Sequence, residues 1–327
     1  MAWFATTRWT DNETNGIEEC VGLIMQNNEN LQGDGSINYA NLTKSKKFDT
    51  TQLVTIDERK ISYNVIEFFV DAITPGSDSI EARTQNIRGL IIIFSDGGRV
   101  HYLINRNYDA LKLLRKLLGY TGKNEISENN LSFNDDVFMW FVKKVFLDDS
   151  TFSFTQTNQN EIKLVINSII GVRGETRDDN RLSAQGNTVL NLISTLSFLL
   201  ESNLLKQIIL RIEYTGHENI EVRLNDKGVI AVEINAYSGK YEDYDEYKLK
   251  TELLLLIYLD LLPKLLQVYY SEKDEDKWSV ESKDTFFNLV QNKLIERLEE
   301  RRTEVSKQQS TTPLENTKDE EKLPDAD

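Results

Sequence analysis

The sequence predicts a mixed α+β fold, in which antiparallel strand pairs and amphipathic helices alternate along the chain. Alternating apolar stretches such as Ile61–Val70 and Ile220–Leu224 have the two-residue period of half-buried strands. Turn sequences such as Asp96-Gly97-Gly98 and Asn225-Asp226-Lys227-Gly228 join neighbouring stretches into hairpins. Between the hairpins, apolar residues recur at the three- and four-residue spacing of a helix face. These three observations together indicate the fold class.

The first half of the chain, residues 1–147, is predicted to form one α+β domain. Strands are expected at Trp3–Trp9, Leu53–Ile56, Ile61–Val70, Gly89–Phe94 and Arg99–Ile104, the first of them at a sheet edge. Helices are expected around Ile17–Ile24 after an Asn15 cap, from Asp109 to Gly119 with Leu111, Leu114, Leu117 and Leu118 inward, and over 135–146. The polar segment 27–47 is expected to be a loop.

The second half, residues 148–307, is predicted to form a second α+β domain with long helices. Strands are expected at Phe152–Thr155, Ile162–Ile170, Gln207–Tyr214, Ile220–Leu224 and Val229–Ile234. Helices are expected over 187–200, over 246–270 with Pro263 kinking or dividing the helix, and over 281–307 with the apolar stripe Phe286, Phe287, Leu289, Val290, Leu294 and Leu298. Residues 308–327 are acidic with little to bury, so a disordered tail is expected there.

Composition narrows the function classes. Of the 327 residues, 39% are hydrophobic, as in a folded protein. One cysteine, Cys20, excludes an intramolecular disulfide, and with two histidines the chain lacks the ligands of a structural zinc site. Without a basic and apolar leader, a cytoplasmic location is expected. The net charge of −15 opposes nucleic-acid binding over the whole surface, so any such binding requires a local cationic face.

Motifs of common enzymes are missing from the sequence. It has no GxxxxGK[ST], no GxGxxG after a strand, and no HExxH, CxxC or GxSxG, so no cofactor is expected. His101 is predicted to be an ordinary sheet histidine, and His217 to lie in a surface turn. One enzyme hypothesis remains, a Mg²⁺-dependent nuclease, because Asp149 precedes Glu161-Ile162-Lys163 by a spacing found in such nucleases.

An unusual segment, Gly171–Arg181, is rich in glycine and arginine and leaves a predicted strand before a predicted helix. Glycines allow close approach of the backbone, and arginines make forked contacts to phosphate oxygens. Arg173, Arg177 and Arg181 are therefore candidate phosphate contacts. The alternative is internal pairing of these arginines with the acidic residues of the same segment, namely Glu175, Asp178 and Asp179.

Two motifs resemble a known family. Phe4-Ala5-Thr6-Thr7-Arg8 is similar to the opening aromatic-Ala-Thr-x-Arg strand of the RexA family of phage-exclusion proteins. The segment 173–179, Arg-Gly-Glu-Thr-Arg-Asp-Asp, is similar to the Arg-Gly-x-Thr-basic-Asp-Asp of that family, also after a strand. The resemblance implies a dimeric cytoplasmic protein that binds DNA with little sequence preference and signals to a membrane partner. It also adds Arg8 as a candidate contact.

The resulting hypothesis is a non-catalytic, nucleic-acid-associated phage-exclusion or anti-phage defence protein. A more distant similarity of plan to the DNA-binding subunit of the Kiwa anti-phage system supports the same class. The expected partners are DNA, a membrane protein encoded nearby, and a second copy of the chain, bound through the apolar helix Leu253–Leu266 or Phe286–Leu298. A protein-interaction module that uses the acidic second half, and the Mg²⁺ nuclease, are the alternatives.

Overall fold

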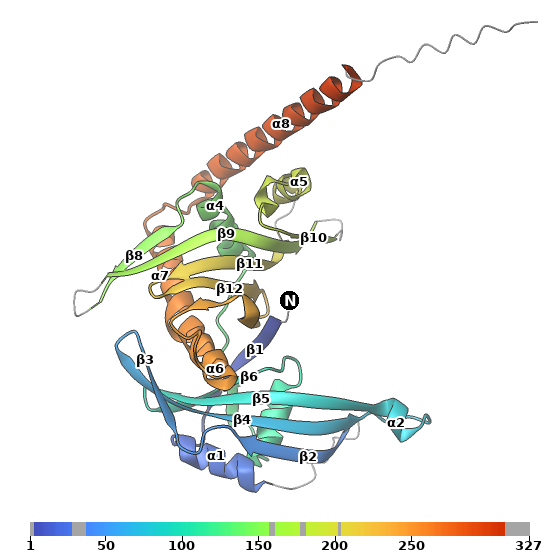
Figure 1. Cartoon of the computed structure of the whole chain (residues 1–327), viewed down its shortest axis with the longest axis vertical. Helices are drawn as coiled ribbons and strands as arrows, with labels where there is room; N and C mark the ends of the chain where they lie inside the picture. The colour runs from blue at the N-terminus through green and yellow to red at the C-terminus, as the bar shows by residue number, and fades with distance from the viewer. Residues whose placement is uncertain (1–2, 28–36, 157–160, 177–180, 202–203, 311–327) are drawn as a thin grey trace, which may run out of the picture.

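The computed structural model describes residues 3–27, 37–156, 161–176, 181–201 and 204–310. Its helices and strands confirm the predicted α+β class (Figure 1). The predicted tail begins at residue 308, but the last helix continues to Ser310, and the rest of the tail lies outside the described residues.

The first half of the chain contributes the lower lobe in Figure 1. Its strands are β1 (Trp3–Asp11), β2 (Asn38–Lys46), β3 (Gln52–Ile56), β4 (Arg59–Ile73), β5 (Thr84–Asp96), β6 (Arg99–Ile104) and β7 (Ile126–Glu128). Its helices are α1 (Ile17–Gln26), α2 (Ile80–Arg83), α3 (Ala110–Leu118) and α4 (Asp135–Phe146). All the predicted strands and helices of this half are present, and β2 is a strand where a loop was expected.

The second half supplies the upper lobe and the long helices. Its strands are β8 (Thr151–Thr155), β9 (Glu161–Glu175), β10 (Arg181–Gln185), β11 (Leu204–Tyr214), β12 (His217–Asn225), β13 (Ile230–Glu233) and β14 (Ser238–Gly239). Its helical segments are η1 (Val189–Asn191), α5 (Ile193–Glu201), η2 (Ile234–Ala236), α6 (Glu246–Leu256), η3 (Ile257–Leu261), α7 (Leu262–Asp274) and α8 (Val280–Ser310). The loop expected in the Gly171–Arg181 segment is wrong where the structure describes it, because residues 171–175 continue β9 and Arg181 begins β10, while residues 177–180 lie outside the described residues.

Strand β1 joins the strands of both halves into one antiparallel sheet, in the order β10-β9-β11-β12-β13-β1-β6-β5-β4-β2. Residues Trp3–Thr6 pair with β13, and Thr7–Thr10 pair with β6. The expectation of an edge strand is therefore wrong, because β1 lies in the middle. Its partner β13 is more than 200 residues away in sequence, which local pattern does not reveal.

One face of this sheet is covered by helices over parts of both halves of the chain. Over the second half, Trp140 of α4 packs on Phe152 of β8 at 5.9 Å and against Tyr269 of α7 at 5.8 Å. Over the first half, the Tyr63 hydroxyl of β4 donates to Glu252 of α6 at 2.9 Å. A single hydrophobic cluster runs through these contacts. The helix pair α6–α7 thus spans both lobes (Figure 1).

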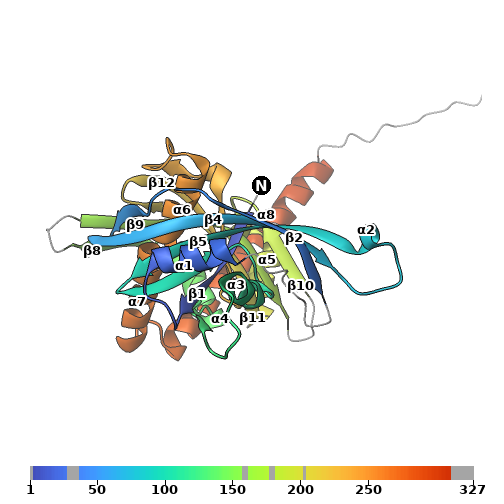
Figure 2. The same cartoon turned by 90° about the horizontal axis from the view of Figure 1, so that it is seen from below.

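The opposite face is covered over the first half alone, within the described residues. Helices α1 and α3 lie across it, as seen from below in Figure 2. Their buried side chains pack with Trp9, Ile66, Phe68, Ile91 and Tyr102 in a second hydrophobic cluster. That cluster contains no residue from β8 to β13. Over the second half, this face of the sheet therefore carries no described helix.

The predicted boundary at residue 147 lies between α4 and the strands that α4 covers. The N–H of Leu205 on β11 donates to the Asp135 carboxylate of α4 at 2.6 Å, and α4 packs on β9 and β11. Helix α4 therefore belongs with the second lobe.

Two predicted helix caps also differ from the structure. Gly16, not Asn15, precedes α1. Asp109 does precede α3, but its carboxylate pairs with Arg106 at 2.6 Å instead of capping the helix. In α3, Leu111 is exposed, while Leu113 takes the expected inward place.

The helix α6–η3–α7 bends at the predicted place. Pro263 has no N–H to donate to the preceding turn of the helix. A π-helical turn, η3, lies directly before it and accommodates this missing hydrogen bond. The stretch Glu246–Asp274 is long and apolar enough to cross a membrane, but 78% of its most apolar window is buried inside the fold. It serves here as the core helix of the sheet.

Candidate nucleic-acid interface

The uncovered part of the sheet is a candidate binding surface, which we call the open face. Successive side chains of a strand alternate between the two faces. On β9, β11 and β12, residues such as Leu164, Ile212 and Val222 point into the helix-covered core. The residues between them form the open face, together with the outward residues of β10, β13 and the start of β1.

The strand registers arrange the open face in rows. One row crosses β10, β9, β11 and β12, and consists of Ser183, Arg173, Gln207 and Asn225. The next row begins on β10 and ends on β1, and consists of Gln185, Gly171, Ile209, Arg223, Ala231 and Ala5. Each row therefore contains one arginine, and Arg173 and Arg223 lie on the same surface two strands apart.

Two of the predicted phosphate contacts lie on this surface. Arg173 is exposed, and no ion pair or hydrogen bond engages its side chain among the described residues. The Arg181 side chain is 73% exposed, and its Nε lies 3.3 Å from a Glu175 carboxylate oxygen. The internal pairing that the sequence left open therefore occurs for Arg181. Arg177, the third predicted contact, lies outside the described residues, as do Asp178 and Asp179.

Three further residues of the open face were missed by sequence reasoning. Arg211 lies on β11 and pairs with Glu221 at 2.8 Å. Arg223 lies on β12, and its guanidinium carbon is 5.0 Å from the centre of the Trp3 ring. A signal existed, because Arg211 and Arg223 both alternate with core residues in predicted strands. Placing Trp3 beside Arg223 required the pairing of β1 with β13.

The open face also carries acidic side chains, so only its cationic side chains without an acidic partner can attract a polyanion. Glu175 and Glu221 are engaged by Arg181 and Arg211. Glu233, opposite Trp3 in the β1–β13 pair, is 2% exposed, so its carboxylate does not contact a ligand at the surface. Arg223 has no acidic partner among the described residues, and burial lowers the pKa of its guanidinium. Among the described residues, the cationic side chains of the open face without an acidic partner are thus Arg173, Arg223 and Lys163, and the exposed Glu161 and Glu213 lie on the same face near Lys163.

The two glycines of the Arg-Gly segment serve packing. A Cβ at Gly174 would lie 2.4 Å from the Phe198 ring of α5 and 2.7 Å from the Leu204 carbonyl oxygen. A Cβ at Gly171 would lie 2.6 Å from the Ile209 side chain. The idea that Gly174 brings the backbone close to phosphate is therefore wrong, because this glycine faces the core.

Arg8 lies on the helix-covered face. Its guanidinium carbon is 5.9 Å from the Phe94 ring centre, and its Nε is buried without a hydrogen-bond partner among the described residues. Burial lowers the pKa of this side chain, and Asp96 partly opposes that effect. The structure therefore separates Arg8 from Arg173 and Arg181.

The residues of the nuclease alternative are spread along the β8–β9 hairpin. Thr151 pairs with Val165, and Thr155 pairs with Glu161. Asp149 precedes β8 and binds Lys144 at 2.7 Å. It is about six residue positions, or about 20 Å, from Glu161 along the hairpin. Among the described residues, no three Asp, Glu, His or Cys side chains gather as metal ligands.

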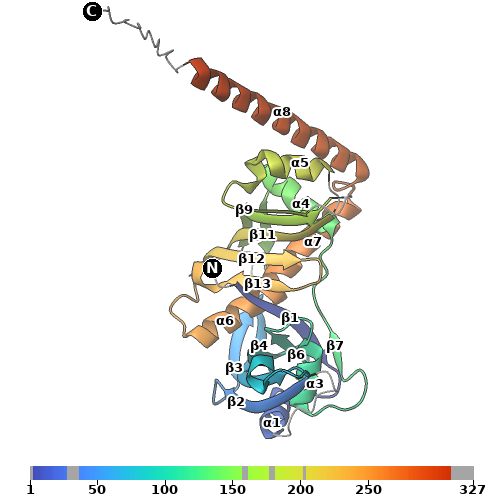
Figure 3. The same cartoon turned by 90° about the vertical axis from the view of Figure 1, so that its right-hand side faces the viewer.

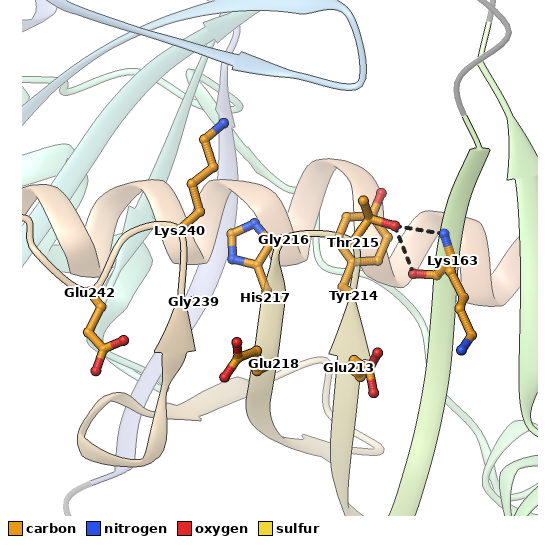
Figure 4. Close-up of a pocket in the computed structure, with 10 residues that line it drawn as sticks. All are labelled: Lys163, Glu213, Tyr214, Thr215, Gly216, His217, Glu218, Gly239, Lys240 and Glu242. Carbon is orange, nitrogen blue, oxygen red and sulfur yellow. Dashed lines mark hydrogen bonds between the residues drawn. The ribbon is translucent and has the colours of Figure 1, made fainter.

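A cavity of about 580 Å³ lies at the ends of β11, β12 and β14 (Figure 4). It is lined by Lys163, Glu213, Tyr214, Thr215, Gly216, His217, Glu218, Gly239, Lys240 and Glu242. His217 is 4% exposed, and its Nδ1 is 2.7 Å from the Tyr237 hydroxyl. The prediction of a surface turn is wrong for His217, which is a buried strand residue.

The chemistry of this cavity is limited. Burial lowers the pKa of His217 to about 4, so the imidazole is neutral near pH 7. The Thr215 hydroxyl accepts from the Lys163 N–H at 2.8 Å, so it is engaged by the backbone (Figure 4). Lys240 extends away from the carboxylates of Glu213, Glu218 and Glu242. The cavity presents mixed charge, and among its lining residues no hydroxyl nucleophile is hydrogen-bonded to a side-chain base, the pairing that nucleophilic catalysis uses.

His101 is buried in β6, and its Nδ1 lies 2.9 Å from the Thr10 hydroxyl, which confirms the predicted sheet histidine. Burial and the nearby Arg8 charge lower its pKa to about 4. Comparison with models of known protein families gives no match, and comparison with curated protein sequences gives no significant match.

Proposed function

We propose that this chain is a non-catalytic nucleic-acid-binding protein that takes DNA on the open face with little sequence preference. The observation that carries the proposal is the presence of Arg173 and Arg223 on one helix-free surface without acidic partners among the described residues. Phosphate contacts from arginine supply affinity but no sequence information. Gln207 and Asn225, in register with Arg173, add neutral hydrogen-bonding groups.

The negative charge of the rest of the molecule weakens this binding and confines it to the open face. With a net charge of −15, most of the molecule repels a polyanion, and the repulsion falls off within about 10 Å at 0.1 M salt. A nucleic acid is therefore held where cations are local and unpaired. We expect weak binding that depends steeply on salt, since each phosphate contact releases a counterion.

The test measures anisotropy of labelled mixed-sequence DNA, as single strand and as duplex, over a series of salt concentrations. Changing Arg173→Ala and Arg223→Ala together should weaken binding and flatten the plot of log affinity against log salt by about 1.4 to 1.8. The control is Arg99→Ala, because Arg99 is exposed at the start of β6, away from the open face. Wild-type protein that binds neither DNA at low salt would overturn the proposal.

For the wider role we propose phage exclusion or anti-phage defence in the cytoplasm, with a membrane protein encoded nearby as partner. Its support is the resemblance of 4–8 and 173–179 to the RexA family. In an infected host, expression with the neighbouring gene should reduce plaque formation. The Arg173→Ala, Arg223→Ala variant should lose protection at equal protein level. Equal protection by this variant would separate defence from DNA binding.

The second candidate function, a protein-interaction module, is favoured by one observation. Apolar side chains are exposed on helices α5 and α8, which contact one another. They are Leu192 at 42%, Leu200 at 37%, Leu289 at 39%, Ile295 at 46% and Leu298 at 45% exposure, with Leu192 just before α5. We propose that this surface joins two copies of the chain. The other predicted interface, Leu253–Leu266, is buried in the core.

A further inference from the structure

We infer that the open face selects single-stranded nucleic acid, whose bases stack on a platform made by Trp3 and Arg223. This inference rests on the proposed function and names the ligand class of the same surface. It is carried by the arrangement of an aromatic ring, a planar cation and small apolar residues in adjacent strands.

The platform has two layers. The Arg223 guanidinium lies over the Trp3 ring, with 5.0 Å between its carbon and the ring centre. Both side chains are half-buried, so part of each remains open to solvent. A guanidinium that rests on an aromatic ring is held flat, and its other face is available to a further planar group. A nucleobase is the planar group that a nucleic acid offers.

The hydrogen-bonding state of Arg223 supports the same ligand. No hydrogen bond or ion pair engages its guanidinium among the described residues. By contrast, Arg211 on the neighbouring strand is paired with Glu221. An unpaired guanidinium stacked on a ring can stack on a base above it and, at the same time, form an ion pair with a nearby phosphate.

The residues around the platform are apolar, and most of them have short side chains. Ala231 lies beside Arg223 on β13, and Ala5 lies beside Ala231 on β1. On the other side, Ile209 leans against Gly171. Ala231 and Ile209 are 1% and 4% exposed, so neighbouring side chains cover this row, and a base would rest on the exposed parts of Trp3 and Arg223. Arg173 and Gln207, in the next row, lie where a backbone phosphate and a base edge of the same strand would pass.

A duplex fits this surface less well. In a duplex the bases are stacked on one another, and proteins reach their edges and the phosphates, not their faces. Single strands expose base faces, and stacking on aromatic rings and arginine planes is tolerant of sequence. The low sequence preference of the proposed function follows from this mode of binding.

The experiment follows tryptophan fluorescence during titration with a mixed-sequence single strand of about 12 nucleotides, within the usual range of site sizes. Trp3 is half-buried, whereas Trp9, Trp140 and Trp278 are 9%, 0% and 2% exposed, so quenching reports on Trp3. We expect quenching by the single strand, in DNA or RNA form, and much less by the matched duplex. Labelled strands measure affinity in parallel.

The variants separate stacking from charge. Trp3→Leu should lower single-strand affinity about tenfold, and Trp3→Phe should restore most of it because a ring is kept. Arg223→Lys keeps the charge but loses the plane, so it should also weaken single-strand binding while duplex binding stays unchanged. Circular dichroism and melting temperature of each variant show that it is folded.

The outcomes distinguish the two proposals. Binding of neither form by the wild-type protein contradicts the proposed function and this inference together. Equal binding of duplex and single strand, without quenching and without an effect of Trp3→Leu, leaves DNA binding intact and overturns the stacking platform.

Discussion

At the scale of single residues, Gly174 shows how a motif that suggests a ligand can serve packing. Its missing Cβ makes room for the Phe198 ring and the Leu204 carbonyl. The backbone oxygen cannot move aside as a flexible side chain could. The glycine between Arg173 and Glu175 thus holds α5 close to β9, which positions the strand that presents Arg173.

Replacing Gly174 by alanine should lower the free energy of unfolding by about 1 to 3 kcal/mol, because the added carbon overpacks a closed site. Denaturant unfolding measures this change. The matched control is Gly22→Ala in α1, where nothing lies within 4 Å of the added carbon. There alanine should stabilise the helix by up to about 1 kcal/mol. Equal effects of the two substitutions would contradict this account.

The buried histidine His217 predicts a pH dependence of stability. Burial and the nearby Lys240 charge lower its pKa to about 4 in the folded chain, whereas an unfolded histidine titrates near 6.5. Its contribution to stability is therefore complete above pH 6.5 and is lost as the pH falls towards 4. The loss is about 3 kcal/mol at full protonation.

We expect the difference in unfolding free energy between wild type and His217→Leu to shrink between pH 7 and pH 4. Chemical denaturation at each pH measures both proteins. The carboxylates of the two proteins titrate alike, so their contributions cancel in this difference. The contribution of His101, whose pKa is also lowered to about 4, is present in both proteins and cancels too. A difference that is constant over this range would show that His217 is protonated without cost.

At the scale of elements, α8 extends beyond the residues that pack against it. Its first part packs through Phe286 and Val290, which are 1% and 0% exposed. Beyond Arg297 every described side chain is exposed, and the helix leads away from the body (Figure 3). A helical end of this length is marginal without tertiary contacts. Ion pairs such as Arg301–Glu304 at 3.0 Å add little.

The proposed dimer would cover this end. Changing Ile295→Glu and Leu298→Glu together should convert a dimer into a monomer, because two charges would be buried in an apolar contact. Light scattering at micromolar concentration measures the mass. Thr303→Glu adds a charge at an exposed position of the same helix and should leave the mass unchanged. A monomeric mass for the wild-type protein would contradict the proposed dimer.

At the scale of the whole molecule, the two lobes share one sheet and one helix pair. Strand β1 belongs to both lobes, and the Tyr258 hydroxyl of η3 donates to the Thr6 carbonyl of β1 at 3.0 Å. Lys264 of α7 also reaches Asp57 in the β3–β4 turn at 2.9 Å. Each lobe is therefore incomplete without residues from the other half of the chain.

We expect a single calorimetric transition in which the measured and van't Hoff enthalpies agree. A fragment of residues 148–307 should not fold, because β13 would lose β1 and the core would lose α4. Two separate transitions, or a cooperative transition of this fragment alone, would show that the lobes are independent domains.

Local patterns determined most of the elements. Alternation placed β3 to β6 and β11 to β13, and the apolar spacing of Ile17, Cys20, Val21 and Ile24 placed α1. Pro263 marked the bend before α7. These signals are short in range, because a strand or helix is specified by neighbours a few residues apart. The polar β2 was missed because its residues lack that alternation.

The sequence by itself determined the α+β class, the amphipathic helices and two arginines of the open face, Arg173 and Arg181. Only the tertiary structure decided which sheet face stays uncovered, that Arg8 lies half-buried over the Phe94 ring, and that Trp3 meets Arg223. The physical reason is distance along the chain. Strand pairing between residues more than 200 positions apart is specified by the whole core, whereas periodicity records only which residues of one strand share a face.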